Sequence, residues 1–374
     1  MKIAYIAFSE EFGGKTAGFV HASEMCEALI SLGHQVTLYI KSGRDKRPDE
    51  LENIEVRFLE KGLKNLINNY SKLKNELKQF DIIHERYSVN PYICMVQAGL
   101  GKPYVLEVND PGAETWTGLK KWIYTIPIKI KFNFADAIIT QTETQKNIIE
   151  KQTNTPVYVV SNGVDVLKFD VFETLIEKER QIIAPNDEKI ICFMSSFREW
   201  HGVLEIPEIA ENVIKKNPNV KFLIIGSGNE MKKFKEIIKE KNLERYFILK
   251  GEVDRDKIPV LLKASDICIA PFSTKKFPQL EKNGFWWCPV KLYEYMAAGK
   301  PIVSVDFEEV KKIVGNAGLL AEPNNLKQFS EFIIKLLSDE NMRKTYGAAG
   351  IEIAENNTWI KKAKETLEVY SKNR

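Results

Sequence analysis

The sequence IAYIAFSEEFGGKT, residues 3–16, begins with a continuously apolar run and ends in a glycine turn. Strands buried on both faces of a parallel sheet are apolar without alternation, so residues 3–8 predict such a strand. Apolar residues then recur at steps of three or four: Ala22, Met25, Leu29 and Leu32. This spacing predicts a helix that Gly33 ends. The stretch therefore indicates a strand–turn–helix unit of an α/β fold.

The same pattern continues along the chain in two series. Further strand candidates of the first series are 35–40, 54–59, 81–84, 104–108, 137–140 and 157–160. Those of the second are 189–197, 221–228, 246–251, 266–272 and 301–306. Helical stretches separate most of them, which predicts two Rossmann-like, doubly wound domains. We place these domains at 1–170 and 185–355, on either side of a charged stretch, and expect a final helix over 356–374.

Composition limits the possible classes of protein. A chain of 374 residues with 44% hydrophobic side chains exceeds what one core usually supports, which favours two domains. The net charge of +3 is too small to imply nucleic-acid binding. The five cysteines are widely spaced and lie mostly among apolar residues, as buried thiols do in a reducing compartment. No stretch reads as a signal peptide or membrane span, so we expect a cytoplasmic protein.

The turn at residues 9–16 first suggests a phosphate loop for ATP. That loop requires glycine where this chain has Ser9, and Gly18 interrupts the start of the helix. No Walker B strand is found in the first half. A glycine turn at a helix N-terminus still favours an anion, while a β–α turn without any ligand is the alternative.

Two stretches of the second half carry more specific signals. IIGSGNE, residues 224–230, reads as a strand, a glycine turn and a helix start, which suits a nucleotide or only a tight turn. FWWCPVKLYEYMAAGKPIV, residues 285–303, predicts a helix that ends at Gly299. Glu294 lies in this helix among apolar residues and needs a partner there. Either sugar hydroxyls or a salt bridge to Lys291 or another basic residue would provide one.

Taken together, these motifs resemble the retaining glycosyltransferases of glycosyltransferase family 4. The resemblance spans nearly the whole chain and is carried by these segments: 13–39, VVSNGVD (159–165), FREWHG (197–202), LIIGSG (223–228), GEV (251–253), APFS (270–273), KLYEYMAAGKPIV (291–303) and TWIKKAKETLEVY (358–370). It implies the GT-B fold, in which two Rossmann-like domains face a central cleft and the last helix crosses back to the N-terminal domain.

The resemblance also implies an activity. Such an enzyme moves a hexose-type sugar from a nucleotide-diphosphate sugar to a glycan or lipid-linked acceptor, as in synthesis of cell-surface polysaccharides or glycoconjugates. The acceptor hydroxyl attacks from the face that the diphosphate leaves, so no strong base is expected. The resemblance implies no cofactor and no required metal.

Site residues follow by matching this sequence to the family's motifs. Glu294 would hold the ribose hydroxyls, and Gly14 would approach the donor phosphates or sugar. Further donor-binding positions are Gly226, Gly228, Gly251, Val253, Val290, Lys291 and Leu292. Asn109, Asp110 and Glu107 are candidates for lining the sugar pocket, and His21 would either face the cleft or be structural.

The chain departs from the family pattern at several of these positions. Trp286 stands where the first glutamate of the E-x7-E motif is expected. Ser196 and His201 replace the arginine and lysine that usually bind the diphosphate. We hypothesise that Arg198 and Lys291 supply the missing positive charge, because a leaving diphosphate needs neutralising. Asn109-Asp110 stands where many members carry His-Asp.

The acceptor is less clear from the sequence. Residues 61–80 and 117–134 are rich in lysine and contain aromatic residues. Such helices rest on anionic lipid, which suggests peripheral binding at the inner face of the plasma membrane, but charged solvated helix faces explain them equally. A nucleotide-sugar epimerase of the same architecture, a non-catalytic nucleotide-sugar binding protein and a P-loop NTPase are the other functions considered.

Overall fold

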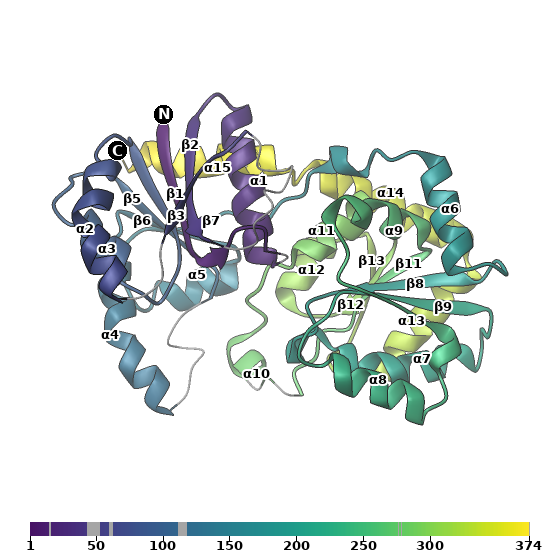
Figure 1. Cartoon of the computed structure of the whole chain (residues 1–374). Helices are drawn as coiled ribbons and strands as arrows, with labels where there is room; N and C mark the ends of the chain where they lie inside the picture. The colour runs from purple at the N-terminus through teal and green to yellow at the C-terminus, as the bar shows by residue number, and fades with distance from the viewer. Residues whose placement is uncertain are drawn as a thin grey trace. The chain divides into compact units, whose positions relative to one another are not determined.

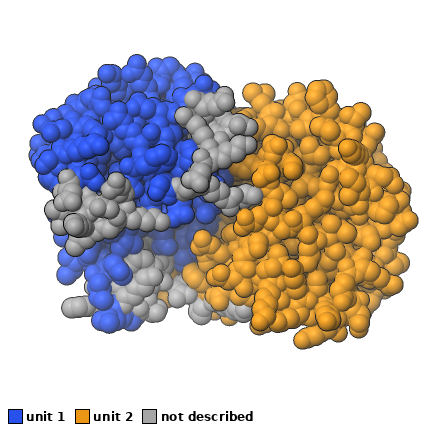
Figure 2. Space-filling model, in the orientation of Figure 1, with its two compact units in different colours: residues 1–162, 286–288, 359–374 blue, residues 163–285, 289–358 orange. Residues whose placement is uncertain are grey.

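The computed structural model describes residues 1–14, 16–42, 53–59, 63–110, 118–275, 277 and 279–373, without the side chains of 63–68, 120–122 and 279. The chain divides into two compact units, which Figure 2 colours separately. Unit 1 comprises Met1–Asn162, Trp286–Cys288 and Trp359–Arg374, and unit 2 comprises Gly163–Phe285 and Pro289–Thr358. Each unit contains one parallel sheet with helices, as the sequence predicts (Figure 1).

The sheet of unit 1 has seven parallel strands in the order β3-β2-β1-β4-β5-β6-β7. Its elements are β1 (Lys2–Glu11), α1 (Ala17–Ser31), β2 (Gln35–Lys41), β3 (Glu55–Leu59), α2 (Leu63–Leu77), β4 (Ile82–Arg86), α3 (Tyr92–Gln97), β5 (Tyr104–Val108), α4 (Gly118–Phe134), β6 (Ala137–Thr140), α5 (Glu143–Ile149), β7 (Val157–Val159) and α15 (Trp359–Lys372). All seven predicted strands of this series are present. Side chains of β1 alternate between two cores, one on each face of the sheet.

The last helix, α15, belongs to unit 1. Its buried residues Trp359, Ala363, Val369 and Tyr370 share a hydrophobic core with α1 and one face of the sheet. These residues recur at roughly helical spacing, so one face of α15 is apolar and is buried. The prediction that the last helix packs on the N-terminal domain is therefore confirmed.

The sheet of unit 2 has six parallel strands in the order β10-β9-β8-β11-β12-β13. Its strands are β8 (Lys189–Met194), β9 (Val220–Ile225), β10 (Phe247–Gly251), β11 (Ile267–Ala270), β12 (Ile302–Val305) and β13 (Gly318–Ala321). Its α-helices are α6 (Glu173–Ile183), α7 (Ile206–Ile214), α8 (Met231–Glu240), α9 (Ile258–Ala264), α10 (Gln279–Asn283), α11 (Val290–Ala297), α12 (Glu308–Val314), α13 (Leu326–Ser338) and α14 (Glu340–Glu355). Its 3-10 helices are η3 (Val166–Phe169), η4 (Glu199–His201), η5 (Val203–Glu205), η6 (Glu244–Tyr246) and η7 (Arg255–Lys257). The sequence analysis missed β13, a four-residue edge strand.

The unit boundaries differ from the predicted ones. The first segment of unit 1 ends at Asn162, whereas the sequence predicted that the first domain ends at 170. The stretch between 170 and 185 contains α6, an amphipathic helix that buries Ile176 and Ile183. The Arg180 guanidinium on α6 donates to Asp266, 3.0 Å away, and this contact fixes the helix to unit 2. The sequence analysis interpreted this segment as a domain junction because it is rich in charged residues. Only one narrow face of the helix is apolar.

Trp286–Cys288 also lie outside the predicted domain, since they belong to unit 1. Trp286 is fully buried, and its carbonyl accepts a hydrogen bond of 2.9 Å from Thr142 Oγ1. Asn162 Nδ2 donates to the carbonyl of Cys288 at 2.5 Å. These tertiary contacts are long-range in sequence, so local pattern could not reveal them.

All five cysteines are free and buried, as the sequence predicts. Within the residues that the structure describes, no helix is long and apolar enough to cross a membrane.

Candidate functional site

In unit 2, the loops that follow β8, β9 and β10 meet at the carboxyl end of the sheet, the usual place for a ligand in such folds. The Gly226 amide donates to the Gly251 carbonyl at 2.7 Å. Gly226 has a φ of 110°, and a Cβ there would lie 1.8 Å from the Ser195 carbonyl oxygen. Only glycine fits this position. The backbone contacts bring three predicted donor-binding loops together.

The loop after β8 also touches the loop after β11. Gly202 has a φ of 69°, and a Cβ there would lie 1.6 Å from the Pro271 carbonyl oxygen. His201 precedes this glycine, and its Nδ1 accepts a hydrogen bond of 3.3 Å from the Arg198 amide. The exposed Arg198 side chain lies over the Trp200 ring, 5.3 Å from its centroid. His201 and Arg198 are thus neighbours, as their sequence spacing predicts.

Lys291, in the first turn of α11, contributes the most unusual group of this edge. Its Nζ lies 5.3 Å from the ring centroid of Phe193 and 5.5 Å from that of Phe272. In the described part of the chain, this buried nitrogen has no hydrogen-bond partner. The same is true of the buried Ser195 Oγ, which follows Phe193 by two residues. A buried ammonium without a partner is costly, which indicates an anionic ligand.

Burial explains the acidity of Lys291. Burial lowers the pKa of Lys291 to about 7, and the negative charge of Glu294 offsets only part of this effect. Burial also holds the pKa of His201 well below its ordinary value, and the positive charges of Lys291 and Arg198 lower it further. His201 is therefore neutral near pH 7. Lys291, with a pKa of about 7, changes its charge near that pH.

Glu294 lies one turn further along α11 and is largely buried, with 12% of its side chain exposed. Arg255 Nη2 lies 3.8 Å from Glu294 Oε1. The sequence left open whether Glu294 pairs with Lys291 or with another basic residue. The structure shows an ion pair with Arg255. This ion pair gives the largely buried carboxylate a partner within unit 2.

The other predicted residues of α11 have apolar side chains in the core. Leu292 is fully buried and Val290 is 9% exposed. The Leu292 amide donates to the Pro289 carbonyl at 3.1 Å. These side chains therefore hold α11 in place, and any ligand contact from Val290 would involve its backbone. Gly228 and Val253 lie in the loops after β9 and β10, where the sequence places them.

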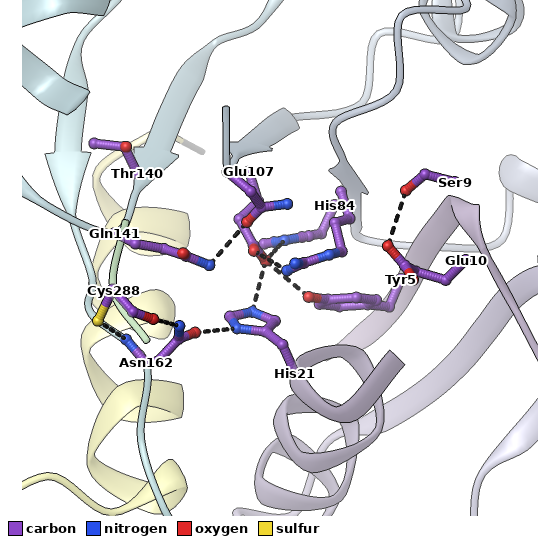
Figure 3. A network of polar contacts seen from close by, with 12 residues as sticks. Tyr5, Ser9, Glu10, His21, His84, Glu107, Thr140, Gln141, Asn162 and Cys288 are labelled. Carbon is purple, nitrogen blue, oxygen red and sulfur yellow. Dashed lines mark hydrogen bonds and ion pairs between the residues drawn. The ribbon is translucent and has the colours of Figure 1, made fainter. Parts of the chain in front are cut away.

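Unit 1 contains a second polar cluster, centred on the Glu107 carboxylate and shown in Figure 3. The contacts to Oε2 come from Tyr5 Oη at 2.8 Å, His21 Nε2 at 3.0 Å and His84 Nε2 at 3.1 Å. Arg86 Nη1 donates to Oε1 at 2.5 Å. Pairing of β1, β4 and β5 explains the cluster, because Tyr5 lies opposite His84 and Arg86 lies opposite Glu107.

This geometry differs from the role predicted for Glu107. The residue is 2% exposed and both carboxylate oxygens are engaged, so it does not line an open sugar pocket. Burial alone would raise the pKa of Glu107, but the charges of His21 and Arg86 and hydrogen bonds from His21 and His84 lower it well below its ordinary value. Glu107 is therefore a buried, ionised structural carboxylate.

The cluster extends to other segments of unit 1. His21 Nδ1 contacts Asn162 Oδ1 at 2.7 Å, and Tyr370 Oη contacts His84 Nδ1 at 2.8 Å. Both ring nitrogens of His21 thus contact side-chain oxygens. His21 has the structural role that the sequence left open, and it links α1 to the segment that ends unit 1. Sequence reasoning missed His84, Arg86 and Tyr370, although charged or imidazole groups inside the apolar strands IIHER and YVLEV were a usable signal.

Asn109 and Asp110 follow β5 and are half-buried. Gln141 Nε2 donates to Asn109 Oδ1 at 2.8 Å, and Gln145 Nε2 donates to the Asn109 carbonyl at 2.6 Å. These contacts fix the orientation of the Asn109 amide. The role of Asn109 and Asp110 in a sugar pocket stays a prediction.

The glycine turn of residues 9–16 is arranged differently from an ATP loop. Thr16 is the N-cap of α1, and its hydroxyl donates to Glu10 Oε2 at 2.8 Å. The Glu10 carboxylate lies against Gly18, where a Cβ would meet it at 2.2 Å. A carboxylate thus already occupies the N-terminal turn, which disfavours an ATP phosphate there. Gly14 donates its amide to the Glu11 carbonyl at 3.0 Å, and Lys15 lies outside the described residues.

Over the described ranges, the structure contains no group of three or more His, Cys, Asp or Glu side chains that could hold a metal ion.

Comparison with sequence families gives two matches that follow one another along the chain. A profile described as Glycosyltransferase Family 4 matches residues 18–167, and a profile described as Glycosyl transferases group 1 matches residues 176–353. The chain is 25% identical over 356 residues to an uncharacterised glycosyltransferase of Methanocaldococcus jannaschii, covering 92% of each chain.

A second relative has a defined activity in its name. It is the N,N'-diacetylbacillosaminyl-diphospho-undecaprenol alpha-1,3-N-acetylgalactosaminyltransferase of Campylobacter jejuni, 28% identical over 87% of this chain and 82% of its own. Among solved structures, sucrose-phosphate synthase of Thermosynechococcus elongatus has a TM-score of 0.80 at 16% identity, covering 99% of this chain and 98% of its own. HepE of Anabaena, solved with UDP-glucose, has a TM-score of 0.78 at 18% identity and covers 100% of both chains. These likenesses show the GT-B fold.

Proposed function

Because the chain belongs to the family 4 glycosyltransferases of GT-B fold, we propose that it is a retaining hexosyltransferase. It takes a hexose-type sugar from a nucleotide-diphosphate sugar and transfers it to a glycan or lipid-linked acceptor. We place this reaction in the synthesis of a cell-surface polysaccharide or glycoconjugate, on the cytoplasmic side of the membrane, without a required metal or cofactor.

The observation that carries the proposal is the buried Nζ of Lys291, which has no hydrogen-bond partner among the described residues. A diphosphate supplies the missing counter-charge. As the bond between sugar and diphosphate breaks, negative charge accumulates on the phosphate oxygens, and a fixed ammonium stabilises that charge. Ser195 lies two residues after Phe193, over which the Lys291 ammonium lies, and its buried hydroxyl also lacks a hydrogen-bond partner among the described residues, so we assign it to the same role.

Other residues of the same edge bind the rest of the donor. Glu294, the carboxylate on α11 beside Arg255, accepts hydrogen bonds from the ribose hydroxyls. Gly251, whose carbonyl accepts from the Gly226 amide, begins the backbone segment 251–253 to which we assign the base. The exposed Arg198 provides a second positive charge for the diphosphate.

The names of the relatives support the substrate classes. The Campylobacter relative is named for transfer to a diphospho-undecaprenol acceptor, and HepE was solved with UDP-glucose. By analogy, we propose a nucleotide sugar as donor and a lipid-linked glycan as the first acceptor to examine.

The proposed function is tested by a thermal-shift screen over UDP-, GDP- and ADP-sugars, followed by NMR of the product. A donor at a hundred times its dissociation constant stabilises the fold by about 2.7 kcal/mol. With the right acceptor, an α-linked donor is expected to give an α-linked product. No response to any nucleotide sugar contradicts the proposal, and a β-linked product contradicts retention. A new sugar nucleotide formed without acceptor identifies an epimerase instead.

Donor affinity is expected to depend on pH. A nucleotide sugar, whose diphosphate has no proton to lose in this range, should bind about tenfold more weakly at about pH 8 than at about pH 6, because a lysine of pKa about 7 loses its charge between them. His201, with its lowered pKa, stays neutral throughout. Isothermal titration calorimetry at several pH values measures this. The Lys291→Met variant is the control and should bind weakly at every pH; a flat profile for the natural protein contradicts the prediction.

A further inference from the structure

Helix α4 of unit 1 exposes a continuous apolar stripe, which we define as Leu119, Ile123, Ile126 and Ile130. These side chains are 71%, 48%, 66% and 55% exposed. Their steps of four, three and four residues put them on one face of the helix. Exposed isoleucines at single positions are common, but an aligned row marks an interaction surface.

The opposite face of α4 fixes the helix in this orientation. Ile128 and Phe132 are fully buried, and so is Lys131. The Lys131 ammonium pairs with Glu85 Oε1 at 2.5 Å and donates to the carbonyl of Ser88 at 2.8 Å. Rotating the stripe inward would therefore break a buried ion pair. In Figure 1, the first turns of α4 extend away from the sheet of unit 1.

This arrangement corrects the sequence-based picture of the segment. Lys131 and Phe132, which the sequence assigned to a basic and aromatic surface, point into the core. The exposed face is instead aliphatic, with Tyr124 36% exposed beside it. Lys129 is exposed as well.

Charge identifies the occupant of the stripe. The sequence of α4 contains no acidic residue and has lysines at 120, 121, 129 and 131. Lys131 is neutralised in the core by Glu85, so the charge available to a partner comes from the exposed Lys129 and the lysines at 120 and 121. A second copy docking stripe to stripe would bring like charges together, which is unfavourable. An anionic lipid surface offers the complementary combination of a hydrocarbon layer and phosphate groups.

We propose that unit 1 binds an anionic lipid bilayer through the α4 stripe. The aliphatic side chains enter the boundary between head groups and acyl chains, the exposed Lys129 meets lipid phosphates, and Tyr124 lies at the interface. The inference rests on α4 alone. It does not require that the protein transfers sugar, although a lipid-linked acceptor would be found at the same surface.

Unit 2 provides a matched control surface. Leu175 and Ile182 on α6 are 47% and 59% exposed, similar to the residues of the stripe. Helix α6 carries Glu173 in its first turn, and its sequence contains further glutamates. Helix α6 has three glutamates against Lys178 and Arg180, a small net negative charge that does not attract anionic lipid, so removal of its apolar patch should leave membrane binding unchanged.

The test is sedimentation of the full chain with vesicles of phosphatidylcholine containing phosphatidylglycerol, without donor or acceptor, and with phosphatidylcholine alone. The triple variant Ile123→Gln, Ile126→Gln, Ile130→Gln keeps good helix formers and should lower the partition coefficient by about tenfold or more. A single Ile126→Glu change repeats the test with one surface substitution. The control Leu175→Gln, Ile182→Gln should bind like the natural chain.

The outcomes separate the possible occupants. Binding to anionic but not neutral vesicles, lost in the α4 variants and kept in the α6 control, supports the proposal. Absence of binding by the natural chain, or equal binding by the triple variant, overturns it. A natural chain that light scattering shows to be dimeric, with monomeric α4 variants, would assign the stripe to a second copy. Because no sugar substrate is present, none of these outcomes depends on the proposed transferase activity.

Discussion

Replacing Lys291 by methionine is expected to lower kcat/KM for the nucleotide-sugar donor by about 10²–10³-fold, the usual effect of removing one preorganised group that stabilises developing charge. Stability should respond in the opposite direction. Methionine fills a similar volume between Phe193 and Phe272 without a buried charge, so unfolding temperature should stay the same or rise. Steady-state kinetics and a thermal melt of the same preparation measure both effects.

A second lysine provides the control for this prediction. Lys300 follows α11, and burial also lowers its pKa, but its charged neighbours are Asp266 and Arg180 at the amino end of β11. Lys300→Met should therefore leave kcat/KM for the donor unchanged. Arg198→Ala, which removes an exposed charge, should have a smaller effect than Lys291→Met. Normal donor affinity and turnover in Lys291→Met would place the diphosphate elsewhere.

Replacing Glu107 by alanine is expected to destabilise unit 1 by about 3–5 kcal/mol, because it leaves the buried Arg86 guanidinium without its carboxylate. Tyr5, His21 and His84 lose an acceptor in the same change. The chain has two units, so a single unfolding transition is not assured. Hydrogen exchange of peptides from β4 and β5 in increasing urea reports on unit 1 directly.

The Glu107 effect should also depend on pH. The pKa of this carboxyl is well below its ordinary value in the folded chain, so its contribution is fully present above about pH 4.3, the unfolded value, and is lost as pH falls toward the folded one. The difference between natural chain and variant should therefore shrink in acid. As a control, Glu55→Ala removes an exposed partner of Arg57, at 2.8 Å, and should cost less than about 1 kcal/mol. A Glu107→Ala loss as small as this would contradict the structural role.

Much of the fold was predictable because its signals are local. The continuous apolar run of residues 3–8 predicts a buried parallel strand, and it forms β1. Residues 104–108, apolar except for Glu107, form β5 as predicted. Helix α11 likewise ends where Gly299 requires it, with a φ of 68°. The edge strand β13 was missed because four residues carry little periodic signal. Helix α6 was missed because its charged residues outnumber its buried ones.

The candidate site was predictable only in part. Glycine turns at Gly226 and Gly251 could be found because strained backbone restricts the residue type. The pairing of Glu294 with Arg255, and the burial of Glu107 among histidines, depend on residues distant in sequence. No local pattern predicts which of several charged residues will meet.

The sequence by itself determined the two α/β units, the helix that returns to the first of them and the loops at the carboxyl ends of the strands, since periodicity and glycine positions act over a few residues. Only the tertiary structure decided that Lys291 is buried without a hydrogen-bond partner among the described residues, while Lys131, in an equally basic stretch, is buried in an ion pair. The structure also shows that the aliphatic side of α4 is exposed to solvent. The physical reason is that desolvation and charge pairing depend on what packs around a side chain, and those neighbours come from other parts of the chain.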